Sequence, residues 1–199
     1  IICCDEKGKI IDGDKILACL AEYIFNKSRS GVNAIVGTLM SNRGLEKFAN
    51  NIGLKFYRSN VGDKFVFELM KKNNCFLGGE QSGHIILKEF GPCGDGILIA
   101  LYLIEIISKY RKKTSEIFDL YKSYFQIQKN IKLKESTLKK NKKINNFLRF
   151  YNNKSIDDVR ILARLSGTEP VIRLLVEGKK YSKIMLLAKK LDKKIKSIV

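Results

Sequence analysis

The sequence predicts an α/β protein, with a layered, mixed-sheet α/β domain followed by a small α+β domain. Up to about residue 111, short runs rich in Val, Ile and Leu alternate with longer amphipathic stretches, which is typical of alternating strands and helices. From residue 123 the order changes to strand, helix, two strands and helix. The intervening residues 112–122 are basic, carry a short helical pattern, and are expected to be a linker.

The elements of the first domain, residues 5–111, follow in chain order from hydrophobic periodicity. Residues 1–4 predict a strand that ends a preceding domain, and Asp12 or Asp14 can cap the helix KILACLAEYIFNK. The next elements are expected to be a strand NAIVGTLM, a helix over 44–51, a strand LKFYRS, a loop and helix VGDKFVFELMKKN, and strands CFLGGE and HIILKEF. The apolar helix ILIALYLIEIISKY closes this domain, and we expect it to be buried on most sides.

The second domain, residues 123–199, opens with FQIQKNIKLKES, which alternates as a strand. The polar amphipathic stretch STLKKNKKINNFLRFYNN predicts a helix, and SKIMLLAKKLDKKIKSI predicts another at the end. Between them, VRILARL and VIRLLVEG predict two strands joined by a short turn.

Composition excludes several classes of protein. The net charge is +18 over 199 residues, but the chain has no arginine-rich block and no basic stripe interleaved with aromatics, so we expect no nucleic-acid partner. No apolar run approaches the roughly 20 residues that span a bilayer, so we expect no membrane partner. The five cysteines form no CxxC pair, which predicts a reduced, cytoplasmic protein whose thiols act as small core residues, and no metal site is expected.

The stretch from Arg164 to Arg173 has the composition of a phosphate-binding turn. Gly167 can adopt a positive φ and Pro170 has no N–H, so the turn can direct free amides, the Ser166 and Thr168 hydroxyls and the Arg164 guanidinium at one point. Several short donors and one bidentate cation suit a phosphate or another oxyanion. The alternative is a tight hairpin turn with a surface arginine.

A second polar loop, residues 78–84, contains the only histidine of the chain. In an extended loop Glu80 and Ser82 would face the same way, and their oxygens suit adjacent hydroxyls of a sugar. His84 titrates near neutral pH, so it can exchange a proton or hold a phosphate. The alternative is a structural loop in which Glu80 pairs with lysines.

Two weaker candidates follow predicted strands. They are Ser41–Asn42 and Asp63–Lys64, and each fits a ligand-binding loop or a helix cap.

Together these stretches resemble the alpha-D-phosphohexomutase family, and within it the members that act on glucosamine phosphate. The resemblance covers essentially the whole chain in the family's order. The matching segments are residues 37–42, 61–64, 79–87, 94–96 and 164–173.

The resemblance implies that the chain holds the family's third domain and its fourth, whose fold is like that of the TATA-box-binding protein. In such enzymes a phosphoserine gives its phosphoryl group to the sugar phosphate, and a hexosamine 1,6-bisphosphate intermediate turns around before the other phosphate returns to the serine. The implied reaction is an isomerase reaction, the interconversion of glucosamine 6-phosphate and glucosamine 1-phosphate for amino-sugar and cell-wall precursor synthesis.

The resemblance also implies roles for the loop residues. His84 would support catalysis near the reacting phosphate. The sugar would contact residues of three loops, namely Glu80, Ser82, Gly83, Ser41, Asn42, Asp63 and Lys64. The phosphate that is not transferred would contact the last turn, through Arg164, Ser166, Gly167, Thr168 and Arg173.

Two parts of the family's machinery are absent from this sequence: the catalytic serine and the Asp-Gly-Asp-Gly-Asp-Arg loop that binds Mg²⁺. The similar string at residues 12–14 precedes a helix and is interpreted as a cap. We therefore expect Mg²⁺ to act only in the full-length enzyme, with the N-terminal domains of the same protein as partners and a homodimer as a compatible assembly. This chain alone is expected to be inactive.

Two other functions remain open. A phosphoglucomutase or phosphomannomutase of the same superfamily would differ in what the loop near Glu80 accepts at C2 of the sugar. A non-catalytic basic module would bind in a way that weakens steeply with salt and does not depend on Arg164.

Overall fold

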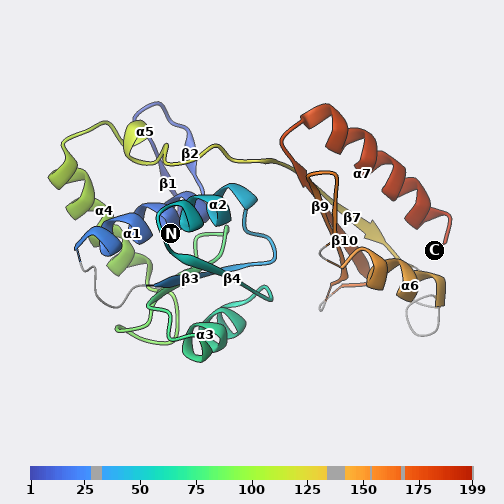
Figure 1. Cartoon of the computed structure of the whole chain (residues 1–199), viewed down its shortest axis with the longest axis horizontal. Helices are drawn as coiled ribbons and strands as arrows, with labels where there is room; N and C mark the ends of the chain where they lie inside the picture. The colour runs from blue at the N-terminus through green and yellow to red at the C-terminus, as the bar shows by residue number, and fades with distance from the viewer. Residues whose placement is uncertain (28–32, 134–141, 153, 167–168, 199) are drawn as a thin grey trace. The chain divides into compact units, whose positions relative to one another are not determined.

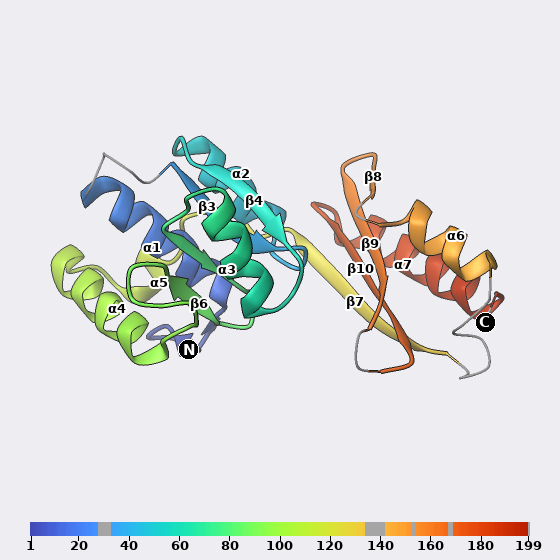
Figure 2. The ribbon, with the colours of Figure 1, turned by 90° about the horizontal axis from the view of Figure 1, so that it is seen from below.

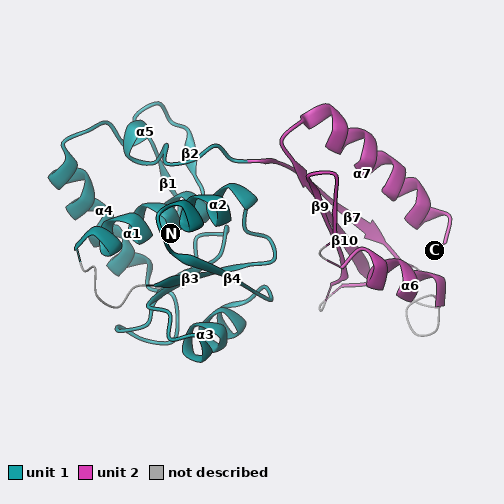
Figure 3. Ribbon diagram, in the orientation of Figure 1, with its two compact units in different colours: residues 1–123 teal, residues 124–199 magenta. Residues whose placement is uncertain are grey.

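The computed structural model describes residues 1–27, 33–133, 142–152, 154–166 and 169–198. The chain forms two compact units, residues 1–123 and residues 124–199 (Figure 3). No helix within the described ranges is long and apolar enough to cross a membrane. The predicted class, a mixed-sheet α/β unit followed by a small α+β unit, is confirmed.

A four-stranded sheet in the order β4-β3-β5-β6 forms the centre of the first unit. β3 (Ala34–Thr38) pairs in parallel with β4 (Lys55–Ser59) and with β5 (Leu77–Gly79), whereas β6 (Ile85–Leu87) runs antiparallel to β5. Because β3, β4 and β5 are parallel, their carboxyl ends lie at one edge of the sheet.

Helices cover both faces of this sheet (Figure 1). α1 (Gly13–Lys27), α2 (Arg43–Asn51) and α4 (Gly96–Tyr110) contribute to the larger hydrophobic core, and α3 (Asp63–Lys72) packs on the opposite face. The period-two alternation of β3 explains this arrangement. Ile35 belongs to the larger core, while Val36 packs with Met70 of α3.

Both ends of the first unit, residues 1–4 and residues 112–122, belong to its compact fold. β1 (Cys3–Cys4) pairs antiparallel with β2 (Ile10–Ile11), so residues 1–4 are held within this unit. Residues 112–122, expected as a linker, include α5 (Thr114–Ile117) and belong to the same compact unit. They do so because Ile117 and Phe118 are buried in its larger core.

The expectation that α4 is buried on most sides is wrong. Three of its apolar side chains pack inward, but Ile97, Leu101 and Ile104 are 78%, 59% and 59% exposed. These positions recur at helical spacing and form one outward-facing stripe. Apolar content identified the helix correctly, but it could not show which sides have neighbours.

The five cysteines differ in how far they are buried. All five are free thiols. Cys19 and Cys75 are buried as the sequence predicts, whereas Cys4 and Cys93 are exposed, so the interpretation as core residues is wrong for these two.

The second unit is an antiparallel sheet in the order β7-β10-β9-β8. Its strands are β7 (Phe125–Lys132), β8 (Lys154–Ile156), β9 (Val159–Leu165) and β10 (Val171–Gly178). α6 (Lys142–Phe150) and α7 (Tyr181–Lys196) pack on the same face of this sheet, where they share one core with the strands (Figure 2).

The short strand β8 is an addition to the predicted order. It turns into β9 through Asp157 and Asp158, which have φ angles of 42° and 64°. Two successive residues with positive φ are typical of the tight hairpin turn that matches strand twist, and aspartate tolerates this conformation. Three residues are too few to give a periodic signal, so the sequence did not predict the strand.

Candidate functional site

Three loops noted in the sequence leave the carboxyl edge of the first unit's sheet. Ser41–Asn42 follow β3, Asp63–Lys64 follow β4, and the turn of residues 80–84 follows β5. The chain passes from β3 to β4 on one side and then returns across β3 to β5. Ligands of open α/β sheets bind at this edge, where the direction of winding reverses.

The loop after β5 is a tight hydrogen-bonded turn. The Gly83 amide donates to the Glu80 carbonyl at 3.0 Å, and the Glu80 amide donates to the His84 carbonyl at 2.9 Å. Gly83 has a φ of 97°, and a Cβ on it would lie 2.0 Å from the Ile1 carbonyl oxygen. The expected extended conformation, with Glu80 and Ser82 facing the same way by alternation, is therefore wrong.

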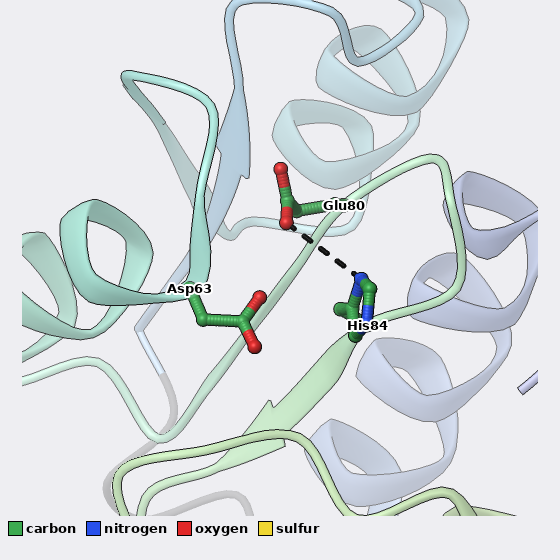
Figure 4. Close-up of side chains that lie close together, drawn as sticks. All are labelled: Asp63, Glu80 and His84. Carbon is green, nitrogen blue, oxygen red and sulfur yellow. Dashed lines mark ion pairs between the residues drawn. The ribbon is translucent and has the colours of Figure 1, made fainter. Parts of the chain in front are cut away.

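The Glu80 side chain is 11% exposed and points into the loop cluster (Figure 4). Its Oε2 accepts a hydrogen bond from the Gly62 amide at 3.0 Å, while its Oε1 lies 3.9 Å from Nδ1 of His84. Burial raises the pKa of Glu80, the Gly62 amide opposes this, and the neighbouring Asp63 carboxylate adds to the rise. Oε2 is thus engaged by the Gly62 amide, and Oε1 is the oxygen that faces His84.

The remaining polar groups of this region are more open. Ser82 is exposed and its Oγ lies 3.3 Å from Nδ1 of His84, whose side chain is 62% exposed. Asp63 is half-buried at the start of α3, and Lys64 is exposed beside it. The fold therefore brings Asp63, Glu80, Ser82 and His84 together.

Ser41 and Asn42 are buried, and their polar atoms serve the loop itself. Ser41 Oγ accepts a hydrogen bond from the Thr38 amide at 3.0 Å, and Asn42 Oδ1 caps α2 by accepting from the Gly44 amide at 2.9 Å. Arg58 donates to the Ser41 carbonyl at 2.7 Å. This is the arrangement that the helix-cap alternative predicts.

Asp14 is a residue whose importance the sequence reasoning missed. The cap of α1 is Asp12, whose Oδ1 accepts from the Lys15 amide at 3.0 Å. Asp14 is fully buried in α1, and its Oδ2 accepts from the Asn42 amide at 2.7 Å, which ties α1 to the β3–α2 loop. Burial raises the pKa of Asp14 to about 7. An aspartate in the first turn of an otherwise apolar helix, next to the capping Asp12, was the available signal.

The second unit places its two motif arginines side by side. Arg164 on β9 is the direct antiparallel partner of Arg173 on β10, so both side chains stand on the same face of the sheet. The Nε atoms of both are buried without a hydrogen-bond partner, and Arg173 Nη2 reaches Glu169 Oε2 at 3.5 Å. Burial, together with the charge of Arg173, lowers the pKa of Arg164.

The turn that joins these strands is closed by the Ser166 amide, which donates to the Val171 carbonyl at 2.9 Å. Ser166 is half-buried beside the arginine pair's strands. The expected contributions of Gly167 and Thr168 lie outside the described residues. Like charges directly opposite each other destabilise a sheet. An anion bound by both guanidinium groups would offset this repulsion, so the arginine pair is a candidate anion site.

Comparisons with known proteins agree over the whole chain. Residues 12–124 match the family described as phosphoglucomutase/phosphomannomutase, alpha/beta/alpha domain III, and residues 129–194 match its C-terminal domain. A phosphoglucosamine mutase of Nautilia profundicola is 43% identical over 99% of this chain and 44% of its own length. One of Campylobacter hominis is 44% identical over 96% of this chain and 42% of its own length.

A solved structure shares the fold. Aspergillus fumigatus N-acetylphosphoglucosamine mutase, in complex with GlcNAc-6P and magnesium, matches with a TM-score of 0.73 at 20% identity, over 98% of this chain and 49% of its own. The chain thus spans less than half the length of the relatives it matches.

Proposed function

This chain belongs to the phosphoglucomutase/phosphomannomutase family, and we propose that it is the sugar- and phosphate-binding part of a phosphoglucosamine mutase. The proposed reaction of the whole enzyme interconverts glucosamine 6-phosphate and glucosamine 1-phosphate. Relatives that bear this name and are 43% and 44% identical support the choice of sugar.

The observation that carries the proposal is the pairing of Arg164 with Arg173. Two guanidinium groups on one face, each with a buried and unpartnered Nε, repel each other. Glu169 reaches only Arg173, at 3.5 Å and at an exposed position, so a bound anion would offset the remaining repulsion. A phosphate accepts several hydrogen bonds in the planar geometry that arginine offers. Arg164, Arg173 and Ser166, with Gly167 and Thr168, are proposed to hold the phosphate that is not transferred.

The turn after β5 is proposed to hold the sugar. Glu80 Oε1 accepts from one sugar hydroxyl, because Oε2 is already engaged by Gly62, and Ser82 donates to or accepts from another. His84 is exposed beside both and supports catalysis by holding a proton or a phosphate oxygen. Asp63 and Lys64 complete the rim, and Ser41 and Asn42 contribute by fixing the neighbouring loop.

This division of labour suits phosphoryl transfer, in which positioning and charge neutralisation supply most of the catalysis. A sugar bisphosphate must be held in two orientations. The sugar ring carries hydroxyl groups on both faces, so the Glu80 carboxylate and the Ser82 hydroxyl can bind the sugar in either orientation. The serine that exchanges the phosphoryl group and the N-terminal domains that carry it are proposed partners from the same protein.

Magnesium is proposed for the whole enzyme, where it would neutralise charge on the transferring phosphate. The residues of this chain that most resemble the family's metal loop do not fit it. Asp12 is engaged as a helix cap and Asp14 is fully buried beneath the β3–α2 loop, so neither offers a carboxylate to a hydrated ion.

Calorimetric titration of this chain with glucosamine 6-phosphate and with inorganic phosphate tests the proposal. We expect Arg164→Met to weaken both ligands by roughly 10- to 100-fold, the loss of a charged hydrogen bond being worth about 1.5–3 kcal/mol. Ser82→Ala is expected to weaken the sugar phosphate alone. Arg149→Met and Ser108→Ala remove matching groups from exposed helix positions and serve as controls.

Unchanged affinity in Arg164→Met, together with binding that falls steeply with salt, would instead favour the non-catalytic basic module. The alternative sugars are separated by rates of the full-length enzyme on glucosamine, glucose and mannose phosphates. A preference for glucose or mannose phosphate would move the assignment to a phosphoglucomutase or phosphomannomutase.

A further inference from the structure

The edge of the first unit's sheet also carries a set of metal-ligand atoms. Asp63, Glu80 and His84 each offer one such atom, and these atoms all lie within 4.8 Å of one another (Figure 4). They come from the start of α3 and from the two ends of the turn after β5. We propose that this Asp63–Glu80–His84 cluster binds a divalent transition-metal ion such as Zn²⁺.

The charge around the cluster supports a cation. The chain has a net charge of +18, yet among the described residues no lysine or arginine forms an ion pair with Asp63 or Glu80. Two neighbouring carboxylates, one of them on a side chain that is only 11% exposed, therefore lack a positive partner other than His84. A bound divalent cation would supply that partner without requiring a charged imidazole.

The Glu80 carboxylate is also held in the orientation that a ligand needs. The Gly62 amide holds Oε2 at 3.0 Å, so the carboxylate cannot turn freely and Oε1 faces His84 Nδ1 at 3.9 Å. This separation is longer than a hydrogen bond. Hydrogen bonds of this kind to the non-ligating oxygen orient metal ligands in known sites.

The distances are compatible with closure around an ion. Bonds of about 2.0–2.2 Å to Zn²⁺ place tetrahedral ligand atoms roughly 3.4 Å apart. Nδ1 and Oε1 must approach each other only slightly, and the exposed His84 ring and half-buried Asp63 carboxylate have room to move. Three protein ligands leave the fourth position to water.

The donor set selects the class of metal. One imidazole nitrogen and two carboxylate oxygens suit Zn²⁺ and similar ions, whereas Mg²⁺ prefers oxygen donors alone. This site is therefore different in kind from the aspartate-rich magnesium loop, which this sequence does not contain.

One consequence rests on the proposed function. Glu80 Oε1 and His84 are the groups assigned to the sugar, so a Zn²⁺ ion in the cluster and a sugar phosphate exclude each other. Zinc would then act as a competitive inhibitor at this loop.

The test is calorimetric titration of the chain with Zn²⁺, in a Cys4→Ser/Cys93→Ser background that removes the exposed thiols. We expect one equivalent of Zn²⁺ to bind, and Glu80→Gln and His84→Ala each to weaken it at least about tenfold, since even orienting partners of metal ligands contribute 10- to 100-fold. Glu80→Gln keeps an oxygen for the Gly62 amide, so the turn is retained. Glu68→Gln, an exposed glutamate of α3, is the matched control.

Zinc affinity that is the same in Glu80→Gln, His84→Ala and the control overturns the site. So does a Co²⁺-loaded chain whose near-ultraviolet spectrum shows thiolate-to-metal charge transfer, because the metal would then lie on cysteine. A competition titration separates this inference from the proposed function. If Zn²⁺ binds the cluster but glucosamine 6-phosphate does not displace it, the metal site stands and the sugar assignment of this loop fails.

Discussion

Replacing Arg164 with methionine should stabilise the β9–β10 hairpin when no anion is present. Arg164 and Arg173 stand directly opposite each other, so removing one charge relieves a repulsion. Methionine keeps most of the apolar length of the arginine side chain, which limits the loss of packing.

The size of the effect follows from the geometry. For two unit charges taken to be about 7 Å apart, Coulomb's law gives about 0.6 kcal/mol in water-like surroundings and about 2.4 kcal/mol at an effective dielectric constant of about 20. The Arg173 side chain is 39% exposed, so solvent and salt reduce the upper figure. We therefore expect the hairpin to gain about 1 kcal/mol, which slows amide exchange by about fivefold.

Hydrogen–deuterium exchange of peptides from β9 and β10 measures this gain without interference from the first unit. In phosphate-free buffer Arg164→Met should exchange more slowly than the wild-type chain, and Arg149→Met should match the wild type. Phosphate at about 100 times its Kd should protect the wild type by about 2.7 kcal/mol and the variant far less. Faster exchange of Arg164→Met without phosphate, or equal protection of both by phosphate, would refute the anion-site argument.

Three further predictions concern buried or strained positions. The pKa of Asp14 is raised by burial to about 7 from 3.8, so the folded chain binds the proton more tightly and loses stability as pH rises from about 4 to 7. Asp14→Asn should abolish this loss, which is at most about 4 kcal/mol, and urea unfolding at pH 4 and pH 8 measures most of it. Gly83→Ala should destabilise the chain and weaken sugar-phosphate binding far more than Gly8→Ala. Both glycines have a positive φ, but only a Cβ at Gly83 would clash with backbone atoms. Equal effects of the two substitutions in calorimetry would contradict the clash. Glu177→Gln leaves the buried Arg160 without its charged partner at 2.6 Å and should lower the free energy of unfolding by about 3 kcal/mol in urea titrations.

Most of the fold could be predicted from the sequence because its elements have clear periods. The strands of the second unit agree closely with VRILARL and VIRLLVEG, and the order of the first unit's elements is as expected. Apart from the short strand β8, the failures have a common physical origin, because they depend on which sides of an element have neighbours. The exposed stripe of α4 and the burial of Ile117 and Phe118 follow from tertiary packing that hydrophobicity alone does not encode.

The sequence indicated which residues the candidate site contains but not how they are arranged. Loops at the carboxyl ends of parallel strands meet at one edge, and the observed sheet order brings Asp63, Glu80 and His84 together. The sequence predicted these strands along the chain but not their order in the sheet. The sequence could not show that Glu80 is buried with one oxygen engaged, because this depends on the Gly62 amide from another loop. The burial of Asp14 was missed for the same reason, since its partner Asn42 lies far along the chain.

Both proposed ligand sites bring like charges together. In the first unit two carboxylates, Asp63 and Glu80, lie together without a lysine or arginine from the described residues. In the second unit Arg164 and Arg173 face each other with buried, unpartnered Nε atoms. Neither pair stabilises the chain by itself, and a one-residue shift in the register of β9 and β10 would place the arginines on opposite faces. A fold that retains such pairs gives up some stability and gains affinity for complementary groups, namely hydroxyl donors or a cation at the first pair and a phosphate at the second.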